Sequence, residues 1–310
     1  MMRVLYASLI GLMIIGSTGT SYGRIDEDMK QTKKERDQIR QSKIKTRSVT
    51  WHEYKFGEPQ KGIRVARTEY DTNGGITEEV QYDEDGEIRG KLTHGYEKGG
   101  NLVETVMYGS DGSIEKKIIR KYDDRGNETE TVEYDGDGEV IIKTLKKNDD
   151  RGHEVEAVVY DDSGELASKI SYGRDPKGNL TDKTTYDAEG QVQKKKTWKR
   201  DPSGNVVEEA VYDVEGVILE KVIRAYDSSN NETITTTHGE EGEFLSKREQ
   251  RYDSKGHIIE SISYGLEGEV TEKLSMRYDP KGNLSEVTTH DPRLNEAREL
   301  KQYVYEYYGK

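Results

Sequence analysis

The 310-residue chain has no cysteine, which excludes disulfide bonds, thiolate metal sites and a lipid-modified N-terminal cysteine. Large apolar side chains are also scarce, since Leu, Ile, Val and Phe together make up 59 residues, about 19% of the chain. With 35% charged residues and a formal net charge of −13, this supply does not fill a compact spherical core. The acidic balance argues against nucleic acid and anionic membranes as partners, because both require a basic surface.

Low hydrophobicity with high charge is typical of disorder, but this chain has 21 tyrosines and a strict internal repeat. A thin β-sheet fits this composition better, because each strand then needs only one modestly apolar face.

The first 23 residues have the pattern of a secretory signal peptide. Arg3 provides the positive start, residues 9–15 are mainly apolar, and Ser21-Tyr22-Gly23 offers a small-x-small cleavage site. The apolar run is shorter than the roughly 20 residues of a membrane-spanning helix. We expect cleavage and no membrane span afterwards, with an uncleaved N-terminal anchor as the alternative. The protein is then secreted, periplasmic or on the outer surface of a bacterial cell.

Residues 24–50 differ in composition from the rest of the chain. They contain no Gly or Pro, and nine Lys or Arg against five Asp or Glu. Apolar residues are too sparse for a helical stripe, so a charged spacer, partly helical or disordered, is expected. A basic arm that binds a polyanion is the alternative.

From residue 51 to residue 310 the chain is built from a 26-residue repeat. Turn starts, most of them Tyr-Asp, are separated alternately by 12 and 14 residues, and glycine follows four residues after 16 of the 17 starts. Asn230 replaces the remaining glycine, and asparagine also tolerates a positive φ. The turn starts are residues 70, 82, 96, 108, 122, 134, 148, 160, 174, 186, 200, 212, 226, 238, 252, 264 and 278.

Asp-x-x-Gly predicts a type I turn in which the aspartate caps the backbone and the glycine forms a left-handed bulge. Proline fits only the position after the aspartate, which is where Pro176, Pro202, Pro280 and Pro292 stand. Each turn therefore reverses the chain, so the expected fold class is all-β, a long antiparallel meander. Seventeen turns define 18 strands, and degenerate turns near Phe56 and His290 would raise the number to about 20. We expect this sheet to be single-layered or coiled.

Strict alternation predicts that Ile114, Ile118 and Tyr122 share one face of the sheet. An apolar residue six positions after each long-strand start is expected to pair with the starting tyrosine, and these pairs would form the main apolar ladder.

Two charged columns accompany this ladder. By strict alternation they lie on opposite faces, unless a bulge shifts the lysines. Their simplest role is solubility, and the alternative is a linear site for a charged polymer. The columns are Lys91, Lys117, Lys143, Lys169, Lys195, Lys221, Lys247 and Lys273, and Glu78, Glu104, Glu130, Glu156, Asp182, Glu208, Glu260 and Glu286, with Ile234 interrupting the second.

The motif Tyr-Asp-x-x-Gly-Asn, complete at residues 122–127 and 278–283 and degenerate at 70–75, resembles the YD repeats of the Rhs family and related MORN-like bacterial toxin–antitoxin repeats. The resemblance covers about residues 54–308. It implies a β-sheet shell, and residues 303–308 are expected to form its last strand.

No residue set indicates a reaction. The sequence lacks nucleophile-elbow, zinc-protease and phosphate-loop motifs, so no catalytic, cofactor-binding or metal-binding residue is assigned and no cofactor is expected. Residues 83–86 and 135–138 faintly resemble calcium loops but match the turn formula better. Trp51 and Trp198 could stack on sugars, although a strand tryptophan usually contacts its cross-strand neighbours. The six histidines are His52, His94, His153, His238, His257 and His290.

The sequence favours an exported, non-catalytic monomeric scaffold that contacts a protein or polysaccharide. A capping or immunity partner in a toxin system is the first alternative, and a carbohydrate-active enzyme is the second.

Overall fold

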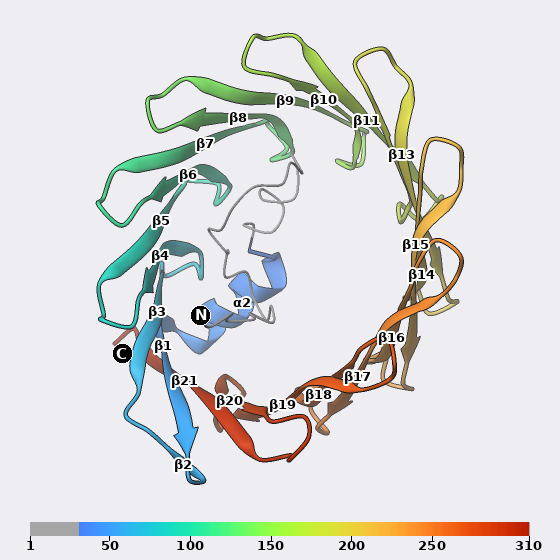
Figure 1. Cartoon of the computed structure of the whole chain (residues 1–310). Coiled ribbons are helices and arrows are strands. Elements are labelled where there is room, and N and C mark those ends of the chain that lie inside the picture. The colour runs from blue at the N-terminus through green and yellow to red at the C-terminus, as the bar shows by residue number, and fades with distance from the viewer. Residues whose placement is uncertain (1–30, 310) are drawn as a thin grey trace.

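The computed structural model describes residues 31–309 and shows one helix and an antiparallel sheet (Figure 1). The helix is α2 (Lys33–Ser42). The strands are β1 (Ile44–Lys55), β2 (Glu58–Pro59), β3 (Ile63–Tyr70), β4 (Ile76–Tyr82), β5 (Ile88–Tyr96), β6 (Leu102–Tyr108), β7 (Ile114–Tyr122), β8 (Glu128–Asp135), β9 (Val140–Asn148), β10 (Glu154–Tyr160), β11 (Leu166–Arg174), β12 (Leu180–Tyr186), β13 (Val192–Arg200), β14 (Val206–Tyr212), β15 (Ile218–Tyr226), β16 (Glu232–His238), β17 (Phe244–Tyr252), β18 (Ile258–Tyr264), β19 (Val270–Tyr278), β20 (Leu284–His290) and β21 (Ala297–Tyr307).

From β3 onward each strand pairs with the next along the chain, so the predicted all-β antiparallel meander is confirmed. The expectation of an open or coiled sheet is wrong, because the sheet closes into a 20-stranded barrel. β1 pairs with β3 on one side and with β21 on the other, and Val49 lies opposite both Ala66 and Tyr303. Closure leaves no unpaired edge along the ring, which removes the usual template for sheet aggregation.

The closing strand begins inside the segment expected to be a spacer. β1 starts at Ile44, so the expected boundary at residue 50 falls within a barrel strand. Ile44, Thr46 and Val49 are buried, and this short apolar pattern was too weak to identify as a strand in the sequence. The helix before it lies inside the ring (Figure 1), and a capping box between Thr32 and Glu35 defines its start. The expected signal peptide lies outside the described residues.

The repeated turns have the geometry that the sequence predicted. In the turn of residues 122–127, the amide of Gly126 donates to the carbonyl of Asp123 at 2.9 Å, and the Asp123 carboxylate accepts from the amides of Arg125 and Asn127. Gly126 has a φ of +81°, and Asn230 has a φ of +62° at the corresponding place. The degenerate turns after β1 and after β20 also form, as expected.

A row of hydrogen bonds runs around one end of the barrel, from the tyrosine that ends a long strand to the carbonyl 20 residues earlier; we call it the carbonyl ladder. Asn148 and Arg174 keep the same bond although they replace tyrosine, donating to the carbonyls of Glu128 and Glu154. Each bond joins two consecutive hairpins, so it sets the spacing of the repeats. The tyrosine members are Tyr96 to Ile76, Tyr122 to Leu102, Tyr226 to Val206, Tyr252 to Glu232 and Tyr278 to Ile258.

The helix identifies the inner wall. The guanidinium of Arg36 on α2 lies 4.8 Å from the ring centre of Tyr96 and donates to the carbonyl of Gly100, so Tyr96 points into the lumen. Burial raises the pKa of Tyr96 to about 12, so its hydroxyl stays protonated even in alkaline solution.

The prediction that Ile114, Ile118 and Tyr122 share a face is wrong, because each long strand contains a bulge after its first residue. Tyr108 pairs with Ile114 and Met107 with Lys116, which leaves Glu115 as the extra residue. Ile114 is consequently 42% exposed on the outer wall, whereas Ile118 is fully buried on the inner wall.

The predicted tyrosine–aliphatic pairs form, but they do not make the core. Tyr82 pairs with Ile88 and Tyr134 with Val140, and these aliphatic partners are exposed on the outer wall. The buried apolar residues lie mainly on the inner wall instead, for example the cluster Leu274, Met276 and Val287.

The contact between α2 and the turn after β3 can be tested with two glycines of nearly equal φ. An added Cβ at Gly74 would lie 2.1 Å from the carbonyl oxygen of Arg36, whereas Gly86 has no atom within 4 Å. Replacing either glycine by alanine should lower the free energy of unfolding by about 1 kcal/mol, because a residue with a Cβ is strained at a positive φ. Gly74→Ala should additionally displace the helix. Denaturant unfolding should show the larger loss for Gly74→Ala, and trypsin should cut faster at Lys33 and Arg36. Equal losses and equal cleavage would show that α2 does not dock there.

The carbonyl ladder can be tested by removing one hydroxyl. Tyr226→Phe leaves the carbonyl of Val206 without its donor and should lower the free energy of unfolding by about 1 kcal/mol. Tyr186→Phe at the opposite end of the barrel is the control, because no hydrogen bond from the Tyr186 hydroxyl occurs within residues 31–309. Equal stability of the two variants in denaturant melts would contradict a structural role for the ladder.

Candidate functional site

The two predicted charged columns lie together on the outer wall, because the bulge shifts the lysines. Lys117 and Glu104 illustrate the arrangement, with Nζ 2.6 Å from Oε1. These exposed pairs contribute little to stability individually. The same contact joins Lys143 to Glu130, Lys169 to Glu156, Lys221 to Glu208 and Lys273 to Glu260.

The column of acids is interrupted where Ile234 takes the acidic position. Lys247, which would meet that acid, pairs instead with Glu249 of its own strand at 2.5 Å. Ile223 and Ile234 are exposed there, so the outer wall of β15 and β16 is less charged than its neighbours.

The inner wall beside α2 carries a buried polar cluster. Arg120 donates to the hydroxyl of Thr105, and His94 lies 3.2 Å from the same hydroxyl and 3.5 Å from a carboxylate oxygen of Glu79. Arg120 and Thr105 are almost completely buried.

The inner wall of β11 to β13 is strongly basic. Lys183 on β12 lies directly opposite Lys196 on β13. Lys194 precedes Lys196 by two residues on β13 and lies on the same face. Arg174 and Arg200, at the ends of β11 and β13, belong to the same inner face. We call Arg174, Lys183, Lys194, Lys196 and Arg200 the basic arc. Like charges directly opposite each other destabilise a sheet, so this arrangement requires a reason.

The two opposed ammonium groups have different partners. Lys183 Nζ lies 5.6 Å from the ring centre of Tyr172, while Lys196 Nζ lies 2.6 Å from Glu209 and 5.3 Å from the ring centre of Trp198. Trp198 Nε1 also donates to Glu209. Lys194 is exposed and takes part in no ion pair within residues 31–309.

Other basic side chains on the inner face lie next to acids. Lys116, which corresponds to Lys194, has its Nζ 2.6 Å from Glu133, and Lys146 lies 2.8 Å from Glu128. The repeat of residues 174–199 is therefore unusual, because it places three lysines on the inner face. One acid, Glu209 on the next strand, faces them.

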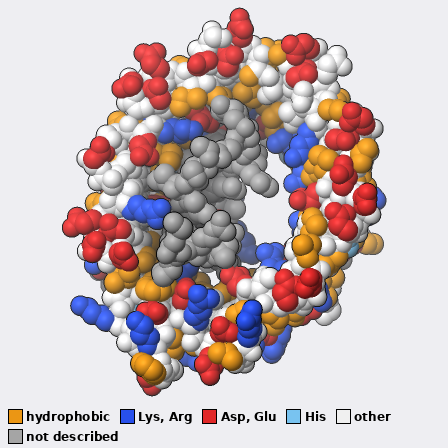
Figure 2. Space-filling model, viewed as in Figure 1, with side chains coloured by type: hydrophobic (Ala, Val, Ile, Leu, Met, Phe, Trp, Pro, Cys, Tyr) orange, Lys and Arg blue, Asp and Glu red, His pale blue; other side chains and the backbone are white. Residues whose placement is uncertain are grey.

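The basic arc faces an open part of the lumen. Figure 2 shows an opening through the ring, with Lys and Arg side chains on its inner wall near the positions of β11 and β13 in Figure 1. A ring of 20 strands is wide enough to leave such a space, because barrels of 16–18 strands already enclose an aqueous channel. A ligand can thus reach the basic arc.

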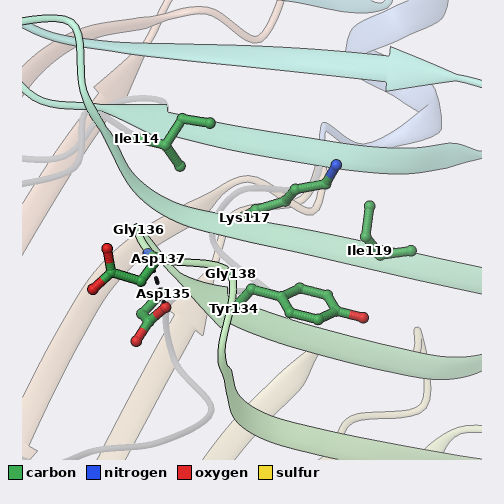
Figure 3. A pocket seen from close by; sticks show the side chains of 8 residues that line it. All are labelled: Ile114, Lys117, Ile119, Tyr134, Asp135, Gly136, Asp137 and Gly138. Carbon is green, nitrogen blue, oxygen red and sulfur yellow. Dashed lines mark hydrogen bonds between the residues drawn. The ribbon is translucent and has the colours of Figure 1, made fainter.

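A second, shallow pocket lies on the outer wall (Figure 3). It has a volume of about 380 Å³ and is lined by Ile114, Lys117, Ile119, Tyr134 and the turn of residues 135–138. Asp135 uses its carboxylate to cap the amides of Asp137 and Glu139. Residues 135–138 resemble a calcium loop in the sequence, but in the structure the Asp135 carboxylate accepts hydrogen bonds from amides of its own turn.

The histidines are dispersed over the barrel, each with a local partner. His257 stacks on Tyr278 with ring centres 4.4 Å apart and bonds to its turn aspartate, Asp253. Trp51 lies far from Trp198 along the ring and bonds to Glu299. The other partners are Gln60 for His52, Thr105 and Glu79 for His94, Asp149 for His153, Gly242 for His238 and Ser275 for His290.

Within residues 31–309, no group of three or more histidine or acidic side chains is arranged to hold a metal ion. In the same part of the chain, no helix combines the length and the apolar character needed to cross a membrane.

Sequence reasoning missed the basic arc. It placed only the lysine column that contains Lys195, and it assigned no face to Lys183, Lys194 or Lys196. The run Lys194-Lys195-Lys196 was the available signal, together with Lys183 one hairpin earlier. Only the register shows that Lys195 points outward and the other three inward.

No protein-family model and no curated protein matches the chain. Sixty-seven chains of solved structures match. A porin-like protein from Bacteroides uniformis is 10% identical with a TM-score of 0.36, over 85% of this chain and 98% of that chain. A porin-like protein from Bacteroides vulgatus is 11% identical with a TM-score of 0.23, over 86% of this chain and 100% of that chain. The Tc holotoxin pore from Photorhabdus luminescens is 12% identical with a TM-score of 0.21, over 83% of this chain and 18% of that chain. Likenesses this distant carry no functional argument, and the resemblance to YD repeats stays a prediction.

Two lysines at the same repeat position test the charge balance of the inner wall. Lys194→Gln removes a cation from a group of like charges, so the free energy of unfolding should stay equal or rise by a few tenths of a kcal/mol. Lys116→Gln breaks a half-buried ion pair with Glu133 and should lower it by about 1 kcal/mol. Denaturant unfolding at low salt measures both. A marked loss for Lys194→Gln would mean that the basic arc stabilises the fold.

Proposed function

We propose that this protein is an exported, non-catalytic scaffold whose lumen binds a polar ligand at the bacterial cell envelope. The observation that carries the proposal is the closed barrel with an accessible inner wall that is strongly basic along one repeat. The N-terminal signal pattern supports export, and the Tyr-Asp-x-x-Gly-Asn turns support kinship with YD-repeat shells.

The outer wall is less suited to a specific ligand. Its lysines and glutamates neutralise each other in exposed pairs repeated around the ring, which presents nearly the same surface in successive repeats. Such a surface is suited to contact with water and to a monomeric protein. The lumen, in contrast, differs from repeat to repeat, because α2 lines one side of it and the basic arc lines another.

A non-catalytic role agrees with the placement of the reactive side chains. The histidines are spread around the ring, and many turn carboxylates cap backbone amides. Binding to a preformed wall needs no reactive side chain, and the carbonyl ladder joins consecutive hairpins of that wall.

Lumen binding can be tested on an array of bacterial polysaccharides, neutral and acidic. Ser168 is an inner residue on β11 opposite Val159, so Ser168→Trp adds bulk to the lumen beside the basic arc. It should lower the signal of every bound polysaccharide, whereas Ile234→Trp on the outer wall should leave the signals unchanged. Mass spectrometry of the polysaccharides afterwards should show no cleavage.

The opposite pattern of losses would place the contact surface on the outer wall and contradict the proposal. Cleaved polysaccharide would contradict a non-catalytic role.

A further inference from the structure

We propose that the basic arc binds the carboxylates of an anionic oligosaccharide. This assignment rests on the proposed function, because it places the ligand in the lumen, and it adds the chemical class of the ligand and the residues that hold it.

The charge balance of the wall is the first argument. The basic arc carries five cations, and the acid that meets them from β14 is Glu209. That carboxylate also lies 3.6 Å from Arg224 and accepts from Trp198, so its charge is shared. The wall keeps an excess of positive charge on a concave surface, which concentrates anions near it.

The fold itself does not require this charge. Lys183 and Lys196 face each other across β12 and β13, a pairing that costs stability. At the position of Lys183, other repeats place uncharged residues such as Thr131 or Ala157, or an acid as at Glu209, on the same inner face, and none places a second cation there. A ligand of opposite charge is the physical reason that accounts for the exception.

The geometry suits a chain of charged units rather than one small anion. The backbones of Lys183 and Lys196 lie on neighbouring strands about 5 Å apart, and the backbone of Lys194 lies about 7 Å from that of Lys196 along β13. The three ammonium groups are thus spread over a patch and not converged on one point. Lys194 is exposed, and Lys183 is half-buried, so both can be reached from the lumen.

The closed sheet favours a glycan over an acidic peptide. A peptide bound to a sheet normally adds a strand and satisfies its backbone amides at an edge. The ring formed by β1 and β3 to β21 has no free edge, so a peptide in the lumen would find no strand partners. Sugar hydroxyls can instead bond to side chains such as Thr185, which lies opposite Lys194, and sugar rings can contact Tyr172 and Trp198 at the rim of the patch.

Calorimetric titration of the full chain with tetragalacturonate, at low and at physiological ionic strength, tests the assignment. The wild type should bind, and the affinity should fall as salt rises. The double variant Lys183→Gln/Lys194→Gln should bind about tenfold more weakly or worse, because it loses two charge-assisted contacts. Lys195→Gln on the outer wall and Lys116→Gln at the equivalent inner position remove the same charge elsewhere and should bind as the wild type does.

Folding of the double variant is checked by a thermal melt, which should occur no lower than that of the wild type because repulsion in the basic arc is relieved. Lys183→Arg/Lys194→Arg keeps the charges and should keep the binding, so a folding defect and a lost site are distinguishable.

Four results would overturn the assignment: no binding of tetragalacturonate by the wild type, unchanged binding by the double glutamine variant, equal binding of neutral maltotetraose, or equal binding of a tetraglutamate peptide. None of these would by itself overturn the proposed function. A ligand of the polysaccharide array that is lost in Ser168→Trp would still show binding in the lumen.

Discussion

The structure depends on β1 pairing with both ends of the meander. Without that strand, β3 and β21 would each present a long row of unpaired backbone groups. The repeats would then form an open sheet with two edges that are prone to aggregation. With it, every long strand gains partners on both sides, and the charged composition is compatible with a folded protein. Closure also creates an interior, which an open sheet with the same turns would lack. The separation of an inner from an outer wall is therefore a consequence of one strand at the start of the domain.

The bulge in each long strand is the second constraint, because it decides which side chains face that interior. It turns Ile114 outward and Ile118 inward, although four positions along a regular strand would keep them on one face. It also brings Lys117 next to Glu104, and the same pairing recurs on the outer wall of other repeats. The inner wall of β11 to β13 carries positive charge that is not paired in this way, and there we place the ligand.

The regularity of the repeat makes its exceptions informative. Arg174 replaces a ladder tyrosine yet keeps the ladder bond to the carbonyl of Glu154, so that exception preserves structure. Lys183 and Lys194 preserve no contact of this kind, and their positions in other repeats carry uncharged residues, acids such as Glu209 and Glu220, or, at Lys116, a lysine that is paired with an acid. Exceptions that keep a bond are explained by the fold, whereas exceptions that add unneutralised charge point to a ligand.

The sequence by itself determined the local structure of this protein. Asp-x-x-Gly fixes each turn because only a residue that accepts a positive φ can follow the type I bend, so the strand order of the meander and the reversal at Gly126 followed directly. Closure, the two walls and the basic arc were decided only by the tertiary structure. Closure depends on β1 meeting β21 across some 250 residues, which no local pattern encodes, and the walls depend on bulges that shift the side-chain alternation by one residue. The lysines of residues 194–196 are adjacent in the sequence, but only the register sends Lys195 to the outer wall and its two neighbours into the lumen.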